Sequence, residues 1–80
     1  MIMKMLIRVS DIAEVRHFQK GWTDYLKINF VDGRITEFSV YHYEDSMRQR
    51  DRCKQLKKAY NAITGACVNE AEFVDIEIDD

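Results

Sequence analysis

The chain lacks proline and has only three glycines and two cysteines in 80 residues, and each shortage excludes a class of protein. Two cysteines cannot form the dense disulfide framework of a small secreted domain. Three isolated glycines supply no phosphate-binding loop. No apolar stretch is long enough to span a bilayer, and Lys4 interrupts the apolar start that a signal peptide would need. We therefore expect a cytoplasmic protein with reduced thiols and no membrane contact.

The composition is that of a single globular domain covering residues 1–80. Hydrophobic residues make up 46% of the chain and the formal net charge is only −2, which excludes a disordered chain. The charge is unevenly placed, because residues 44–64 carry six basic and three acidic side chains, whereas residues 65–80 carry six acidic side chains and no basic ones. The two segments either neutralise each other in the fold or face different partners.

The two ends of the chain show the alternation of β-strands. Residues 3–9 and 73–79 alternate apolar side chains with polar or charged ones, so each segment predicts a strand with one buried face. The polar face of the second strand is acidic, whereas the first strand carries Lys4 and Arg8. Because opposite charges stabilise neighbouring strands, we expect these two strands to pair.

Residues 23–43 predict a β-hairpin around Asp32-Gly33. A two-residue turn would pair core positions with polar ones, whereas a three-residue loop over residues 31–33 pairs Leu26 with Phe38. We therefore predict the three-residue loop, with Gly33 at positive φ.

Residues 46–64 predict the single long helix. Ser46 followed by Gln49 is a capping-box pattern, and Gly65 is placed to end the helix. Apolar side chains recur at helical spacing on one side: Cys53, Leu56, Tyr60 and Ile63. This side is expected to pack on the hairpin.

Residues 10–20 fit two structures, and the choice decides the fold. The β-branched and aromatic run at residues 15–18 favours a strand, whereas Ser10 could cap a short helix that ends at Gly21. We predict an α+β fold: an antiparallel sheet of four or five strands with the helix on one face. The order is β-β-β-β-α-β, or the ferredoxin-like β-α-β-β-α-β if residues 11–20 are helical.

One helix cannot cover both faces of such a sheet, so the other face is expected to be open. Its side chains include three tyrosines, which are enriched where proteins meet. The expected partner-binding residues are Tyr25, Lys27, Glu37, Tyr41 and Tyr43. Equally, the tyrosines could be ordinary strand formers. Trp22, beside Gly21 in a turn, either fills the core at the end of the sheet or forms the rim of the same surface, and burial is the more common fate.

Two charged surfaces are further candidates. An acidic edge could present carboxylates to a partner that normally binds phosphates, and its residues are Asp75, Glu77, Asp79 and Asp80. A basic helix face could contact nucleic acid, and its residues are Arg50, Lys54, Lys57 and Lys58. The acidic end of the chain would repel the same phosphates. We therefore favour the interpretation that the basic residues form a solvated helix face.

The sequence predicts no cofactor, no metal site and no enzyme activity. His17, His42, Cys53 and Cys67 show no zinc-type spacing. We expect Cys53 to act as a small core hydrophobe and His42 to be a structural histidine, with its hydrogen bonds satisfied, at the edge of the core. No spacing singles out an acid, a base or a nucleophile.

These observations favour a small non-catalytic protein-binding module of the inhibitor or adaptor type. Its partner would be a larger protein or a second copy in a homodimer, and a nucleic-acid-binding domain is the alternative. Size and composition associate such chains with phage and mobile-element accessory factors that act on host defence or nucleic-acid-handling proteins.

Overall fold

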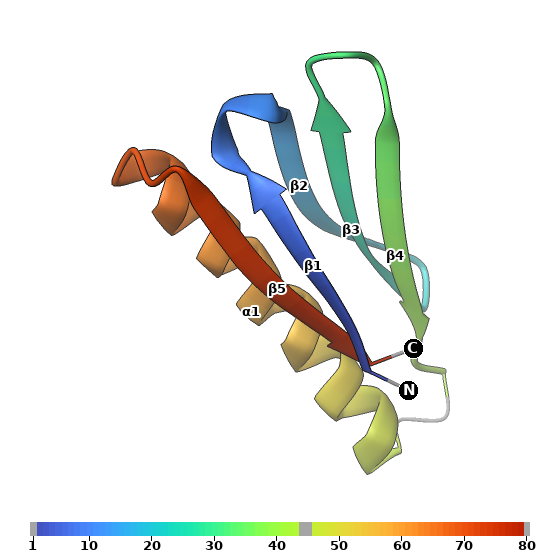
Figure 1. Cartoon of the computed structure of the whole chain (residues 1–80). Helices are drawn as coiled ribbons and strands as arrows, with labels where there is room; N and C mark the ends of the chain where they lie inside the picture. Colours follow the sequence, from blue (N-terminus) through green and yellow to red (C-terminus); the bar gives the residue numbers. More distant parts are fainter. Residues whose placement is uncertain (1, 44–45, 80) are drawn as a thin grey trace.

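The computed structural model describes residues 2–43 and 46–79, and it confirms the α+β class with the strand at residues 12–20 (Figure 1). In chain order the elements are β1 (Ile2–Arg8), the short 3-10 helix η1 (Val9–Asp11), β2 (Ile12–Lys20), β3 (Thr23–Phe30), β4 (Ile35–Tyr41), α1 (Met47–Val68) and β5 (Phe73–Asp79). The order β-β-β-β-α-β is therefore the one that the sequence favoured.

The first and last strands pair antiparallel, as their charges predicted. Lys4 lies opposite Glu77, and the Lys4 Nζ is 3.7 Å from a Glu77 carboxylate oxygen. Arg8 differs from the expectation, because its partner in the register is Phe73 rather than an acidic residue. The Arg8 guanidinium instead lies 5.5 Å from the centroid of the Phe73 ring, a cation–π distance.

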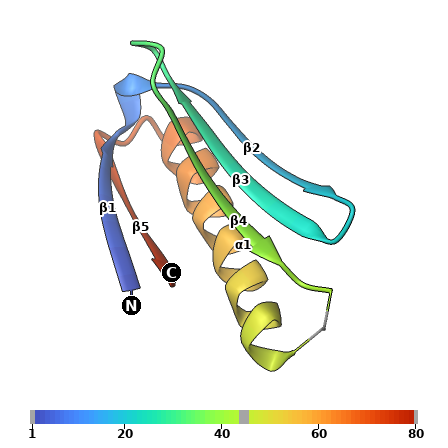
Figure 2. The same cartoon turned by 90° about the vertical axis from the view of Figure 1, so that its right-hand side faces the viewer.

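The five strands divide into two sheets rather than forming one. β1 and β5 form one sheet, and β2, β3 and β4 form the other in that order. The 3-10 turn η1 redirects the chain between them, and the sheets diverge around α1 (Figure 2). This arrangement lets one helix bury apolar side chains against both sheets.

Each of the two hairpin turns of the larger sheet contains a glycine. Gly21 and Trp22 form a two-residue turn between β2 and β3, with Gly21 at φ 62°, the first-position glycine that a type II′ hairpin prefers. The loop between β3 and β4 has the predicted three residues, because the Phe30 N–H donates to the Arg34 carbonyl at 2.9 Å. Gly33 has φ 93°, as predicted.

The helix begins as predicted but ends later. The Ser46 Oγ accepts a hydrogen bond from the Gln49 N–H at 3.2 Å. The prediction that Gly65 ends the helix is wrong, since α1 continues to Val68 and stops where Glu70 takes φ 56°. Two bonds close this end as a Schellman motif: Ala71 N–H to Ala66 O at 2.9 Å and Glu70 N–H to Cys67 O at 3.3 Å. A helix tolerates an interior glycine at a cost of about 1 kcal/mol.

The core lies between α1 and the two sheets, with the helix contributing Leu56, Ala59 and Ile63. The remaining buried side chains come from four strands: Ile7, Leu26, Ile28, Val40, Val74, Ile76 and Ile78. Figure 2 shows α1 on one side only of the β2–β3–β4 sheet, so the opposite face is open. Within the described ranges the structure has no helix that could cross a lipid bilayer.

Candidate functional site

The open face of the three-stranded sheet carries Tyr25 and Tyr41, as expected from the strand phase. Tyr25 is half-buried because its ring stacks on Phe18, at a centroid distance of 5.1 Å. Lys27 and Glu37 lie directly opposite each other in the β3–β4 register. The face therefore combines aromatic rings with a cross-strand pair of opposite charges.

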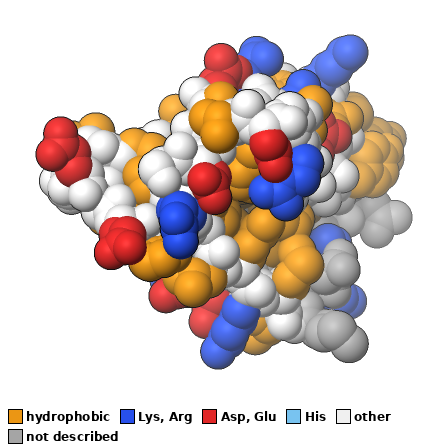
Figure 3. Space-filling view, turned by 45° about the horizontal axis from the view of Figure 1, so that its top comes forward, with side chains coloured by type: hydrophobic (Ala, Val, Ile, Leu, Met, Phe, Trp, Pro, Cys, Tyr) orange, Lys and Arg blue, Asp and Glu red, His pale blue; other side chains and the backbone are white. Residues whose placement is uncertain are grey.

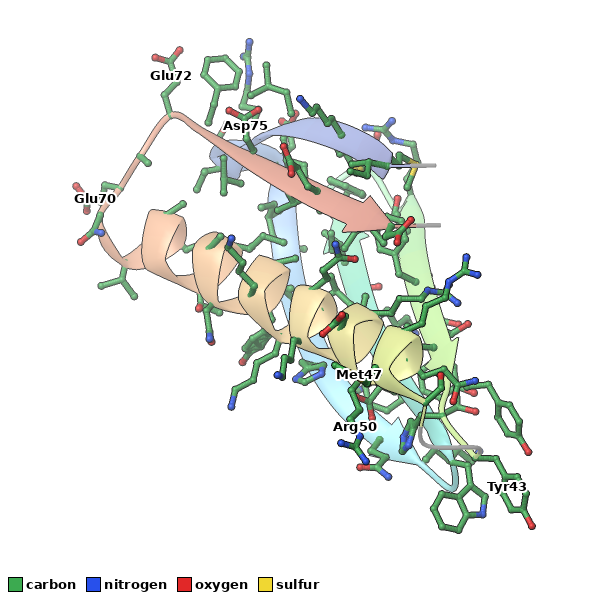
Figure 4. The ribbon with its side chains drawn as sticks, turned by 90° about the horizontal axis from the view of Figure 1, so that it is seen from below. Tyr43, Met47, Arg50, Glu70, Glu72 and Asp75 are labelled. Carbon is green, nitrogen blue, oxygen red and sulfur yellow. The ribbon has the colours of Figure 1, made fainter. Side chains whose placement is uncertain are left out.

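Three exposed aromatic side chains gather at one end of this face and form what we call the aromatic patch: Trp22, Tyr41 and Tyr43. Their exposed fractions are 55%, 58% and 60%. The Trp22 ring meets Tyr43 edge-on at 5.4 Å, and Tyr41 stacks on Tyr43 at 6.2 Å. Figure 4 shows Tyr43 projecting from the end of the molecule where α1 begins.

Trp22 forms the rim of the surface, which was the second of its two expected positions, and the more common fate of burial is wrong for this residue. The two-residue turn places Trp22 beyond the end of the sheet, where there is no core for the indole to enter. Its ring packs instead against surface neighbours, Tyr43 and the edge of His42, whose centroid is 6.2 Å away. The sequence leaves both positions open for Trp22, because the type of residue favours burial whereas its place in a turn favours the surface.

The acidic edge is only partly free. Asp75 and Glu77 are exposed, but Glu77 is paired with Lys4. The main chain of Asp79 is bound to α1, since its N–H donates to Gln55 Oε1 at 2.9 Å and its carbonyl accepts from Arg52 Nε at 3.3 Å. Asp80 lies outside the described residues. Further acidic side chains lie at the turn between α1 and β5, on the left in Figures 3 and 4.

The basic helix face is exposed along α1, on the side of the sheet away from Tyr25 and Tyr41. All four expected residues are exposed there: Arg50, Lys54, Lys57 and Lys58. Lys58 also lines a groove of about 340 Å³ between α1 and β5, together with Asp75 and Glu77. In this groove the basic and acidic segments of the chain lie side by side, so they offset each other's charge.

A second hollow, which the sequence did not predict, separates the two sheets. It has a volume of about 350 Å³ and is lined by β1 and by the β3–β4 hairpin. Leu6 and Ile35 line it and are 64% and 59% exposed. β1 and β4 are the edge strands here, since each pairs with a single neighbour.

A cluster of titratable groups lies beneath the aromatic patch, and it includes two residues that were expected to be merely structural. Asp24, His42 and Cys53 each place one ligand-type atom within 4.8 Å of the other two. The His42 N–H donates to the Trp22 carbonyl at 2.9 Å, which fixes the chain beside the β2–β3 turn. The expectation of a hydrogen-bonded structural histidine is wrong for His42, because its Nε2 is buried and has no hydrogen bond among the described residues.

The electrostatics of this cluster differ from those of a catalytic triad. Burial and, after it, the neighbouring Asp24 carboxylate together raise the pKa of the Cys53 thiol to about 11. Asp24 contacts both other groups, with its Oδ1 3.4 Å from His42 Nε2. In a triad the imidazole, not the carboxylate, stands next to the thiol and takes its proton.

Sequence spacing gave no sign of this cluster, but strand register does. Asp24 pairs with Val40, and His42 follows Val40 by two residues, directly after the end of β4. Cys53 lies on the helix side that packs there. The predicted hairpin register therefore already places Asp24 near His42.

No protein-family model matches the chain, and no curated protein or solved structure is significantly similar to it.

Proposed function

We propose that this protein is a non-catalytic binding module that docks onto another protein through the aromatic patch and the adjoining open sheet face. The observation that carries the proposal is the exposure of Trp22, Tyr41 and Tyr43 at more than half of each side chain. Aromatic side chains are enriched at the centres of protein interfaces, where burial of a ring supplies most of the binding energy.

Contacts within the patch support the same conclusion. The rings of Trp22 and Tyr41 both pack on Tyr43, so the three side chains present one continuous apolar surface. Lys27 and Glu37 on the neighbouring sheet surface provide a polar rim of both signs. The patch therefore has the apolar centre and polar surround of a protein-binding site.

The proposed class is that of an inhibitor or adaptor acting in the cytoplasm. Size and composition associate it with phage and mobile-element accessory proteins that act on host defence or nucleic-acid-handling proteins. In such a role the exposed carboxylates of Asp75 and Glu77 would add charge complementarity toward a basic partner surface.

The double variant Tyr41→Ala/Tyr43→Ala should lose partner binding while the fold is retained, because both side chains are mostly exposed. We expect at least about a tenfold loss of affinity, which is the effect of removing an interface hot spot. The measurement is capture of a co-purifying partner by tagged protein, followed by calorimetric titration with the identified partner. Light scattering with and without the substitutions distinguishes a second copy of the chain from a different protein.

The matched control is Lys54→Ala/Lys57→Ala, which removes two exposed side chains from α1 on the other side of the sheet. This variant should bind as the wild type does. If the lysine variant loses binding and the tyrosine variant keeps it, the proposal is wrong and the basic helix face is the binding surface. Retention on heparin at low salt that is lost in the lysine variant would then identify nucleic acid as the ligand.

A further inference from the structure

Three side chains with different metal-binding atoms converge at the end of the core where β4 leaves the sheet. They come from β3, from the segment after β4, and from α1, so no local sequence motif unites them. We propose that Asp24, His42 and Cys53 form a binding site for one Zn²⁺ ion. This inference is independent of the proposed protein-binding function.

The spacing of Asp24 and His42 suits two ligands of one ion better than a hydrogen bond. The Asp24 Oδ1 lies 3.4 Å from His42 Nε2, but the two groups lack hydrogen-bond geometry, and Nε2 is shielded from solvent. An oxygen and a nitrogen that share a tetrahedral Zn²⁺, with bonds of about 2.0–2.1 Å, stand about 3.3 Å apart. His42 Nε2 is one of four buried side-chain polar atoms that lack a hydrogen bond among the described residues, and an ion would bind to it in place of the missing bond.

Cys53 completes a donor set that is typical of zinc. Thiolate, imidazole and carboxylate are the three protein ligands that Zn²⁺ takes, with a Zn–S bond of about 2.3 Å. Sulfur and nitrogen on one tetrahedral zinc stand about 3.5 Å apart. Since all three atoms already lie within 4.8 Å, a side-chain shift of at most about 1.3 Å closes the site.

The charge of the cluster also favours a divalent cation. Zn²⁺ binding releases the proton of the Cys53 thiol, and the resulting thiolate and the Asp24 carboxylate together bring two negative charges that the divalent ion neutralises. Arg52 is the basic neighbour of Cys53. Its Nε donates to the Asp79 carbonyl at 3.3 Å, so this nitrogen is directed toward β5.

The cluster lies near the surface. The side chains of His42 and Asp24 remain 21% and 16% exposed, although His42 Nε2 itself is shielded. Three protein ligands leave a fourth tetrahedral position for water. The Trp22 ring, edge-on to His42 at 6.2 Å, lies close enough to report binding by its fluorescence.

Co²⁺ is the spectroscopic probe for the test, since it occupies zinc sites with the same ligands. One Co²⁺ per chain should produce a thiolate-to-metal absorption band and quench the fluorescence of Trp22, which is the single tryptophan of the chain. Zn²⁺ should displace the cobalt, and Mg²⁺ should not, because Mg²⁺ prefers oxygen ligands. Absence of the absorption band in the wild type overturns the proposal.

The ligand variants Cys53→Ser and His42→Gln should each weaken Co²⁺ binding at least about tenfold. The matched controls make the same substitutions at the cysteine and the histidine that lie outside the proposed site. Cys67→Ser changes the exposed cysteine on the same helix, and His17→Gln changes the other histidine, whose Nε2 is likewise buried without a hydrogen bond. Unchanged binding in Cys53→Ser, or lost binding in Cys67→Ser, contradicts the site.

A second measurement needs no variant and decides the question even if a ligand variant fails to fold. Wild-type protein is treated with a thiol-alkylating reagent with and without Zn²⁺, and each cysteine is followed by mass spectrometry. Zn²⁺ should protect Cys53 and leave Cys67 reactive. The reaction is run at a pH high enough to label Cys53 in the metal-free protein, because its pKa is raised, and equal labelling of Cys53 with and without Zn²⁺ then contradicts the proposal. Metal binding without partner binding, or the reverse, separates this inference from the proposed function.

Discussion

Asp32 and Arg34 close the loop between β3 and β4 through two contacts to one carboxylate. The Arg34 N–H donates to Asp32 Oδ1 at 3.0 Å, and the Arg34 Nε donates to Oδ2 at 2.6 Å. The backbone N–H is the largest cause that lowers the pKa of Asp32 below its usual value of 3.8. A lowered pKa means that the charged form stabilises the folded loop, and this stabilisation is lost as the pH falls through the lowered pKa.

We expect Arg34→Ala to raise the pKa of Asp32 only part of the way toward 3.8, because the dominant backbone donor remains. NMR titration of the carboxyl carbon measures this directly. Asp32→Asn is the companion variant, and it should remove the contribution of this group to the acid dependence of stability. A return of the pKa fully to its usual value in Arg34→Ala would show that the side chain, not the backbone, controls the charge.

At the scale of the element, α1 ends at the left-handed turn made by Glu70 and not at Gly65. Glu70 occupies a left-handed conformation at φ 56°, which a side chain with a Cβ adopts at some cost. Gly65, three residues before the end of the helix, has open space where a Cβ would stand. Glycine adopts the left-handed conformation freely, yet Gly65 lies inside the helix and Glu70 makes the left-handed turn.

Two substitutions should therefore each stabilise the protein. Glu70→Gly relieves the left-handed turn and Gly65→Ala favours the helix interior, and each should raise the free energy of unfolding by about 0.5–1 kcal/mol. Urea denaturation followed by circular dichroism measures both. Gly33→Ala, at φ 93° in the β3–β4 loop, is the control in the opposite direction and should destabilise. A loss of stability in Glu70→Gly would contradict the account of how α1 ends.

The strand pairing was predictable from the sequence, whereas the end of α1 was not. Register follows from side-chain alternation over many residues, so Leu26 opposite Phe38 and Lys4 opposite Glu77 are each fixed by several neighbours at once. The helix end depends on one or two residues, and Glu70 with φ 56° carries no compositional sign of its role. Glycine has a low propensity for helix interiors, and this is why Gly65 was predicted to end the helix.

At the scale of the whole molecule, one helix joins two separate sheets. Leu56 is fully buried and belongs to the core that β3, β4 and β5 share. The sequence could not show this division, because the same alternation of side chains fits one sheet or two. The Asp24–His42–Cys53 cluster was missed for a related reason, since only the packing of α1 on the sheet brings Cys53 to the other two residues.

Leu56→Ala should lower the free energy of unfolding by about 2–5 kcal/mol, the usual cost of a cavity left by a large core side chain. Both sheets should lose structure in the same transition, because α1 packs against each of them. Chemical denaturation followed by circular dichroism and by Trp22 fluorescence tests whether the two probes coincide. Val68→Ala, whose side chain is 81% exposed on the same helix, is the matched control and should change stability little.

The ring of Trp22 packs edge-to-face with both Tyr43 and His42, at centroid distances of 5.4 and 6.2 Å. A ligand that repositions this indole from either direction alters the surroundings of the opposite neighbour. By thermodynamic linkage, if a bound ion changes the affinity of the protein for its partner by some factor, the bound partner changes the affinity for the ion by the same factor. Trp22 thus lies between the aromatic patch and the Asp24–His42–Cys53 cluster, and any coupling between a partner and an ion bound there would be reciprocal.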